Sequence, residues 1–284
     1  MPLKPLVNAA TLAAHLGDPG WIPVDCRFDL ASPGAGRAAY RQGHIPGARY
    51  AHLDDDLAAP PRSGDGRHPL PEPAVFAARL AAWGISDDST VVAYDAGAGT
   101  IAARLWWMMG WLGHARVHVL DGGLGAWQAE GLNLQSGTPE WRPETFRVKE
   151  LRQDRVVTTD QLPGLLEKGA VLLDARAEER FLGRAEPIDP VAGHIPGARS
   201  FPFSRTIASH GRLRAADALR TDLLPLLGGR APQDVIAMCG SGVTACHLLL
   251  SMEVAGLGRG RLYVGSWSEW IRDPDRPVVT SHND

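Results

Sequence analysis

Short apolar runs alternate along the chain with longer stretches in which hydrophobic residues recur at helical spacing. The runs that predict strands are 22–25, 170–174, 235–238 and 261–264, and the stretches that predict helices are 215–227 and 245–252. Short strands that alternate with helices are typical of a parallel sheet covered by helices on both faces. The pattern therefore predicts an α/β fold.

The same pattern occurs twice, with a period of about 145 residues. The block Gly-His-Ile-Pro-Gly-Ala-Arg at 43–49 recurs letter for letter at 193–199. Three further pairs of blocks follow the same order: 24–27 with 173–176, 91–100 with 235–244, and 121–127 with 264–270. Four matched blocks in one order indicate two tandem copies of a single domain. We expect the repeated histidine, His44 or His194, to be structural and to bond backbone inside its turn.

The segment between the two copies is polar and carries Pro139 and Pro143, which is typical of a linker. We therefore expect a first domain over 1–140, a linker over 141–155 and a second domain over 156–284. The full length of 284 residues suits two domains of ordinary size.

A tight turn that begins at Cys239 joins the predicted strand 235–238 to the predicted helix 245–252. A cysteine at the carboxyl end of a parallel strand lies beside the next helix N-terminus, where loop amides and the helix dipole favour the thiolate. We expect these amides to point at the sulfur, the glycines to let the backbone curl, and the hydroxyls to reach the same centre. The loop residues with these roles are Gly240, Ser241, Gly242, Val243 and Thr244.

Structural roles are the alternative for several of these side chains. A cysteine at a strand end is often a small buried side chain that only packs, and this is our interpretation of Cys26 and Cys246. Arg176 has a counterpart, Arg27, in the other copy, so we expect it to make a structural ion pair with a carboxylate.

The sequence Cys-Gly-Ser-Gly-Val-Thr-Ala at 239–245 resembles the active-site loop of the rhodanese superfamily, in its two-domain sulfurtransferases that use 3-mercaptopyruvate or thiosulfate. The resemblance covers essentially the whole chain and implies the α/β rhodanese fold in both copies. It also implies that Cys239 carries a persulfide between a sulfur donor and an acceptor. Cysteine phosphatases use a loop of the same shape, with an arginine six residues after the cysteine that binds phosphate. This position is Ala245 here, which counts against a phosphatase or an arsenate-reducing enzyme.

The two copies differ at the catalytic position, because Asp95 stands in the first copy where Cys239 stands in the second. An aspartate cannot carry a persulfide, so we expect a non-catalytic first domain and one catalytic centre per chain. The Asp95 carboxylate is expected to accept hydrogen bonds from its own loop amides, in place of a bound anion. The first domain would then form a wall of the substrate cleft.

The resemblance also suggests residues that bind the donor. Arg180 matches the family arginine that follows an Asp-x-Arg motif, and its guanidinium suits a carboxylate or thiosulfate. The second arginine of mercaptopyruvate enzymes corresponds to Asp189 here, and Arg184 is the candidate to replace it. Asp54 and His68 match a family aspartate and histidine that reach the active site, where His68 would hold the donor or move protons.

These residues predict a double displacement in which sulfur moves from 3-mercaptopyruvate or thiosulfate through Cys239 to cyanide, a small thiol or a thioredoxin-like protein. The loop residues 240–242 are uncharged, which favours monoanionic 3-mercaptopyruvate over dianionic thiosulfate. A thiosulfate-preferring rhodanese and a non-catalytic rhodanese-like binding module stay as alternatives. Inability to hold a persulfide would favour the binding module.

Composition excludes other classes. A net charge of −3 provides no basic surface for nucleic acid, and no apolar run has the length of a membrane span or a signal peptide. Three cysteines do not make a disulfide framework, which favours a cytoplasmic, reducing compartment. The histidines and cysteines do not cluster at metal-ligand spacing, so we expect no metal and no other cofactor.

Overall fold

The computed structural model describes residues 4–280, which form two compact units. Of these residues, unit 1 comprises 4–59, 70–152 and 208–213, and unit 2 comprises 60–69, 153–207 and 214–280. This division departs from the sequence domains 1–140 and 156–284 in three places. Segment 60–69, from the first copy, belongs to unit 2, and segment 208–213, from the second copy, belongs to unit 1. The first part of the expected linker 141–155, as far as Arg152, belongs to unit 1.

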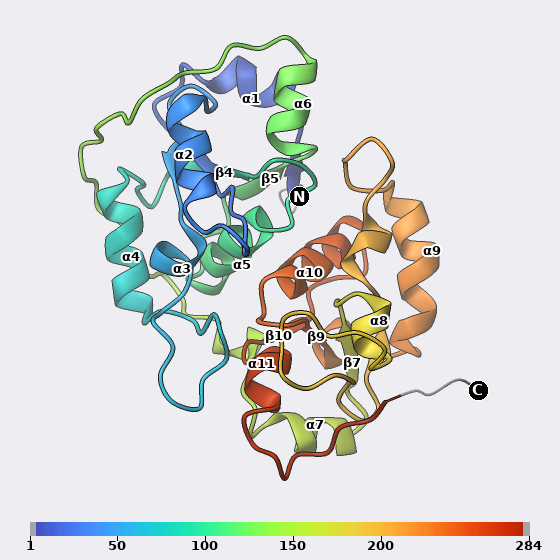
Figure 1. The fold of residues 1–284 in the computed structure, drawn as a ribbon. Helices are drawn as coiled ribbons and strands as arrows, with labels where there is room; N and C mark the ends of the chain where they lie inside the picture. Colours follow the sequence, from blue (N-terminus) through green and yellow to red (C-terminus); the bar gives the residue numbers. More distant parts are fainter. Residues whose placement is uncertain (1–3, 281–284) are drawn as a thin grey trace. The chain divides into compact units, whose positions relative to one another are not determined.

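Unit 1 is a five-stranded sheet with the order β1-β5-β4-β2-β3, and all of its strands are parallel. Helices surround this sheet (Figure 1). The elements are β1 Leu6–Val7, α1 Ala9–His15, β2 Trp21–Asp25, α2 Ala35–Gln42, β3 Arg49–Tyr50, α3 Leu53–Asp56, α4 Pro73–Ala82, β4 Thr90–Tyr94, α5 Ala102–Trp111, β5 Val117–Leu120 and α6 Gly123–Ala129.

Unit 2 has a second parallel sheet with the order β6-β10-β9-β7-β8, which repeats the order of unit 1 strand for strand. The elements are η1 Gln153–Arg155, β6 Val156–Val157, α7 Leu162–Glu167, β7 Val171–Asp174, α8 Glu178–Phe181, β8 Arg199–Ser200, η2 Phe203–Thr206, α9 Ala216–Leu227, η3 Pro232–Asp234, β9 Val235–Met238, α10 Thr244–Val254, β10 Arg261–Tyr263 and α11 Ser266–Trp270. The predicted tandem α/β domains are confirmed.

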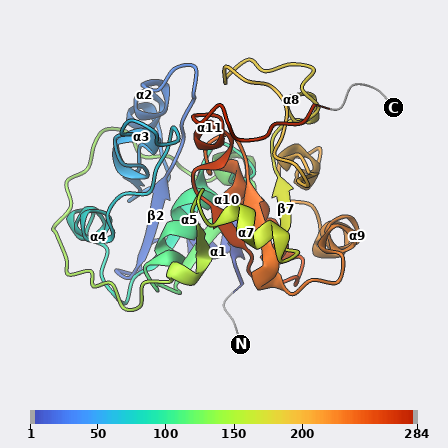
Figure 2. The same cartoon turned by 90° about the horizontal axis from the view of Figure 1, so that it is seen from below.

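The central strand β9 is covered by helices on both of its faces, and its side chains point alternately toward each of them. Ile236 and Met238 point into a cluster with Trp267 and Tyr263, to which α7 and α11 contribute. Helix α10 packs against β9 and β10, and nearly all of its residues are buried (Figure 2). A strand covered on both faces carries a continuous apolar run, as Val-Ile-Ala-Met does here.

The repeated Gly-His-Ile-Pro-Gly-Ala-Arg block is structural in both units. Nδ1 of His44 lies 2.7 Å from the carbonyl oxygen of Tyr40, and Nδ1 of His194 lies 2.8 Å from that of Phe181. The expected bonds to backbone therefore form, but they reach the preceding helix rather than closing the turn itself. The turn leaves each ring stacked on an aromatic side chain of that helix, at a centroid distance of 4.0 Å in unit 1 and 3.8 Å in unit 2.

The Asp-x-Arg motif is also structural in both units. Arg176 donates through Nε and Nη2 to the Asp174 carboxylate, at distances between 2.7 and 3.1 Å, and through Nη2 to the Gly193 carbonyl. Arg27 makes the same contacts to Asp25 and to the Gly43 carbonyl. The ion pair expected for Arg176 is confirmed, and it links the end of a central strand to the repeated block.

Candidate functional site

Cys239 lies directly after β9, the middle strand of the sheet in unit 2, at the carboxyl edge where ligands of parallel sheets bind. The residue is only 2% exposed. Its backbone is held on both sides: the amide donates to Ser266 Oγ at 3.2 Å, and the carbonyl accepts from the Trp267 amide at 3.0 Å. The backbone of Cys239 is therefore held by the first residues of α11.

Two glycines shape the loop for different reasons. Gly242 has a φ of +79°, a left-handed conformation that glycine adopts without a steric cost. Gly240 has no such conformation, so the curl expected of both glycines belongs to Gly242 alone. A Cβ on Gly240 would lie 2.8 Å from Nη2 of Arg67 and 3.4 Å from Nη2 of Arg180. Two guanidinium groups therefore approach the loop at Gly240, and a side chain there would displace the end of Arg67.

The corresponding loop of unit 1 shows what such a turn can hold. The Asp95 carboxylate accepts hydrogen bonds from four backbone amides, those of Gly97, Gly99, Ile101 and Ala102, at 2.8 to 3.3 Å. The expectation that Asp95 takes the place of a bound anion is confirmed. A loop of this length at this strand end therefore turns several amides toward one acceptor.

The amides of the Cys239 loop are available to an acceptor. In the part of the chain that the structure describes, those of Ser241, Val243 and Ala245 have no hydrogen-bond acceptor. Among the described residues none of these three amides bonds to Sγ either, and the contact expected between the loop amides and the sulfur stays a prediction. The two loops also differ in detail, because the left-handed residue is Gly99 in unit 1 and Gly242 in unit 2.

The segment 60–69 brings a histidine to this loop. Nδ1 of His68 lies 2.7 Å from Oγ of Ser241, and both side chains are buried. The direction of this bond depends on which nitrogen of the ring carries the proton. The predicted site residues His68 and Ser241 thus lie together beside Cys239.

Segment 60–69 is anchored on α11 of unit 2. The amide of Arg67 donates to Oγ of Ser268 at 3.0 Å, and Nε of Arg272 donates to the Asp65 carbonyl at 3.3 Å. A Cβ on Gly66 would lie 2.7 Å from the carbonyl oxygen of Gly265, so a glycine is required where the two backbones meet. The backbone that leads into His68 is therefore held in place.

Arginines and carboxylates form a network next to the loop. Arg180 Nε donates to both Glu186 oxygens at 2.9 Å, and its Nη2 donates to Asp189 at 2.9 Å. The other Asp189 oxygen accepts a hydrogen bond from Nη1 of Arg67. Burial would raise the pKa of Glu186, but hydrogen bonds from Arg180 and from the Asp189 amide outweigh burial and lower it. Glu186 therefore stays ionised and holds Arg180 in place.

Arg67 is a residue beside the loop that the sequence analysis did not single out. It lies next to His68 in the chain, but the sequence contains no signal that its side chain would reach Gly240 and Asp189. Arg184 is exposed on the turn after α8, and its backbone amide bonds to the Glu179 carbonyl. Asp54 is an exposed residue of α3 in unit 1. The roles expected for Arg184 and Asp54 stay predictions.

The other cysteines pack in the two cores. Cys26 is fully buried at the end of β2, where burial, with the nearby Asp25 carboxylate, raises the pKa of its thiol. Cys246 is fully buried in α10, and its Sγ lies 3.2 Å from the Gly242 carbonyl. Ala245 is also fully buried, so the loop itself offers no arginine to a phosphate.

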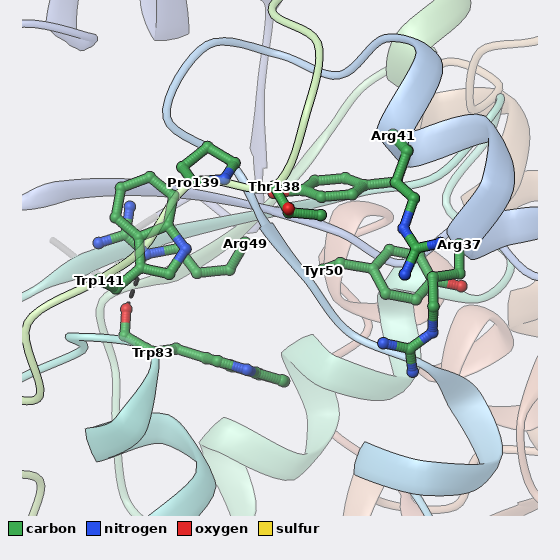
Figure 3. A pocket seen from close by; sticks show the side chains of 9 residues that line it. Arg37, Arg41, Arg49, Tyr50, Trp83, Thr138, Pro139 and Trp141 are labelled. Carbon is green, nitrogen blue, oxygen red and sulfur yellow. Dashed lines mark hydrogen bonds between the residues drawn. The ribbon is translucent and has the colours of Figure 1, made fainter.

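A separate pocket in unit 1 contains none of the expected site residues. Arg49 borders it and stacks under Trp141, with its guanidinium carbon 3.7 Å from the ring centroid (Figure 3). Its Nε donates to the Trp83 carbonyl at the end of α4, and burial lowers the pKa of Arg49 to about 10. Arg49 belongs to the repeated block, and its counterpart Arg199 also donates to a helix carbonyl, that of Leu226 in α9, but through Nη1. The arginine therefore has a structural role in this pocket.

Two classes of feature are absent from residues 4–280. No three histidine, cysteine or acidic side chains lie close enough together to hold a metal ion. None of the helices there combines the length and the hydropathy that a membrane span requires.

Comparison with known proteins places these observations in context. Residues 8–130 and 158–273 each match the rhodanese-like domain family. The chain is 49% identical to a probable 3-mercaptopyruvate sulfurtransferase of Pseudomonas aeruginosa, over 97% of this chain and 98% of the relative. It is 42% identical to a putative thiosulfate sulfurtransferase of Mycobacterium tuberculosis, over 96% of each. The structure of 3-mercaptopyruvate sulfurtransferase from Leishmania major superposes with a TM-score of 0.85 at 33% identity, over 95% of this chain and 75% of that one.

Proposed function

This chain belongs to the rhodanese-like family and is a sulfurtransferase, and we propose that it transfers sulfur from 3-mercaptopyruvate through a persulfide on Cys239 to a thiophilic acceptor. The observation that carries the proposal is the contrast between the two loops. In unit 1 the amides are occupied by the Asp95 carboxylate, whereas in unit 2 the amides of Ser241, Val243 and Ala245 await an acceptor beside a thiol.

The reach of the two side chains supports a persulfide as that acceptor. The carboxylate oxygens of Asp95 lie two bonds beyond Cβ, whereas the thiol sulfur of a cysteine lies only one bond beyond it. The terminal sulfur of a persulfide lies two bonds beyond Cβ, so it reaches as far as an aspartate oxygen does. We expect the amides to stabilise the negative charge on that outer sulfur, as an oxyanion hole stabilises oxygen.

The first half-reaction loads the cysteine. The Cys239 thiolate attacks the sulfur of 3-mercaptopyruvate, the carbon–sulfur bond breaks, and its electron pair stays on carbon. The proton of the donor thiol ends on that carbon, which releases pyruvate and leaves a cysteine persulfide anion. Atoms and charge balance without an oxidant or reductant.

The contact between Ser241 and His68 supports a route for that proton. The Ser241 hydroxyl is joined to the imidazole by a hydrogen bond of 2.7 Å, and both belong to the immediate surroundings of the loop. A hydroxyl coupled to a histidine can accept one proton and deliver another without a change in its own charge. We assign the pair to proton transfer between the donor thiol and the product carbon.

The second half-reaction regenerates the thiolate. An acceptor such as cyanide or a thiol, including that of a thioredoxin-like protein, attacks the outer sulfur, and the sulfur–sulfur bond breaks. Thiols are abundant in the cytoplasmic compartment that we expect for this chain. Ping-pong kinetics follow from the two displacements.

The experiment that tests the proposal compares donors in steady-state sulfur transfer to cyanide, with Cys239→Ser as the control. We expect kcat/KM with 3-mercaptopyruvate to exceed that with thiosulfate at least tenfold, a difference of about 1.4 kcal/mol in transition-state binding. The reverse preference would make the chain a thiosulfate-preferring rhodanese. No turnover with either donor would favour the rhodanese-like binding module.

A further inference from the structure

We propose that Arg67 is the second residue that binds the donor carboxylate, and that Asp189 holds it in position. Arg180 is the first residue of this kind, so the inference rests on the function proposed above. Arg67 comes from segment 60–69, and the family resemblance matches Asp189 to the position of the second arginine of mercaptopyruvate enzymes. The second guanidinium of the family is thus missing at position 189, and Arg67 of segment 60–69 supplies one in its place.

Within residues 4–280, each of the two arginines has a guanidinium nitrogen without an acceptor near Gly240, in the loop that begins at Cys239. A Cβ on Gly240 would lie 2.8 Å from Nη2 of Arg67 and 3.6 Å from Nη1 of Arg180. Among the residues that the structure describes, neither of these two nitrogens has a hydrogen-bond acceptor. Both therefore have donors to offer at the residue that follows the catalytic cysteine.

Asp189 fixes the spacing of the pair. Its carboxylate accepts from Nη1 of Arg67 with one oxygen and from Nη2 of Arg180 with the other. The Asp189 side chain is only 3% exposed, whereas that of Arg67 is 25% exposed. A buried carboxylate that bridges two guanidinium groups fixes the geometry of their remaining N–H donors.

Backbone contacts restrict Arg67 further. Its amide is bonded to Ser268, and Nε of its guanidinium is buried without a partner among the described residues. An unpaired buried donor costs free energy in the unliganded protein. A ligand oxygen at this position would remove that cost.

The charges of the network indicate which anion fits. The three arginines Arg67, Arg176 and Arg180 are matched by the three carboxylates of Asp174, Asp189 and Glu186. Such a balanced cluster supplies directed hydrogen bonds rather than an excess of positive charge. A single carboxylate is better suited to it than a dianion, in agreement with 3-mercaptopyruvate as the donor.

The test is the kinetics of Arg67→Gln with 3-mercaptopyruvate and cyanide. Loss of one charge-assisted hydrogen bond predicts a KM raised about tenfold or more. A role confined to holding His68 in place would lower kcat instead, so we expect kcat to change less than about threefold. Arg62→Gln, an exposed arginine of the same segment, is the matched control and should behave as wild type.

A binding measurement separates this inference from the proposed function. Pyruvate carries the same carboxylate as the donor, so its affinity for Cys239→Ser protein can be followed by NMR titration without turnover. Adding Arg67→Gln should weaken pyruvate binding about tenfold. An unchanged KM for 3-mercaptopyruvate, or an unchanged pyruvate affinity, would overturn the role of Arg67. Absence of turnover by the wild type would instead refute the proposed function.

Discussion

At the residue scale, Cys239, the proposed catalytic residue, is held by contacts to its backbone. The Cys239 amide and carbonyl are both bonded to the first residues of α11, and its loop contributes Ser241 to a hydrogen bond with His68. A cysteine held in this way needs little reorganisation before it attacks a donor. In the proposed mechanism the surrounding side chains transfer the proton and bind the carboxylate of the donor.

The Ser241–His68 bond predicts coupled losses on mutation. Ser241→Ala and His68→Gln should each lower kcat by about 10- to 100-fold, because each breaks the same path of proton transfer. The double variant should be hardly worse than either single variant, which a double-mutant cycle on kcat would reveal. Losses that simply multiply would show that the two side chains act independently.

Sequence reasoning identified the residues of the site that lie close together in the chain. Cys239 and its loop follow from an apolar strand, two glycines and a helix, all within the eighteen consecutive residues 235–252. Arg67 could not be found in this way, because its position depends on how segment 60–69 packs on α11. The approach of two guanidinium groups to Gly240 was also hidden, since they come from residues distant in the sequence.

At the element scale, the turn between β10 and α11 holds the Cys239 loop through a residue in a strained backbone conformation. Ser266 is the one non-glycine residue with positive φ among residues 4–280, at +52°, and its Oγ accepts from the Cys239 amide and donates to the Tyr263 carbonyl. The matching residue of unit 1 is Gly123, at +53°. Unit 2 thus keeps a strained serine where unit 1 uses a glycine, and the serine hydroxyl bonds to the catalytic residue.

Two substitutions at Ser266 separate the strain from the hydrogen bond. Ser266→Ala loses the hydroxyl and keeps the strain, whereas Ser266→Gly loses the hydroxyl and relieves the strain. We expect the alanine variant to unfold more easily than the glycine variant by about 1 kcal/mol in urea titrations. Both should lose kcat, because neither holds the Cys239 amide. Equal kcat in the wild type and in Ser266→Gly would show that this bond does not matter for catalysis.

At the scale of the whole molecule, a duplicated fold has kept one architecture and divided its roles. Both units have the same strand order and the same Asp-x-Arg and histidine contacts, which the repeated blocks in the sequence predicted. Asp95 and Cys239 show the division most clearly, because the first fills its own loop and the second leaves amides available. The assignment of segments 60–69 and 208–213 could not be predicted, since periodicity alone does not reveal which unit a loop packs on.

The most direct test of the account is the mass of the intact protein after exposure to 3-mercaptopyruvate without an acceptor. We predict that the wild type gains the mass of one sulfur atom, and that cyanide removes it. Cys26→Ala and Cys246→Ala should gain the same mass, because these buried thiols pack in the cores, and Cys239→Ser should gain none. A wild type that gains no sulfur, or a Cys239→Ser variant that still does, would contradict a persulfide on Cys239.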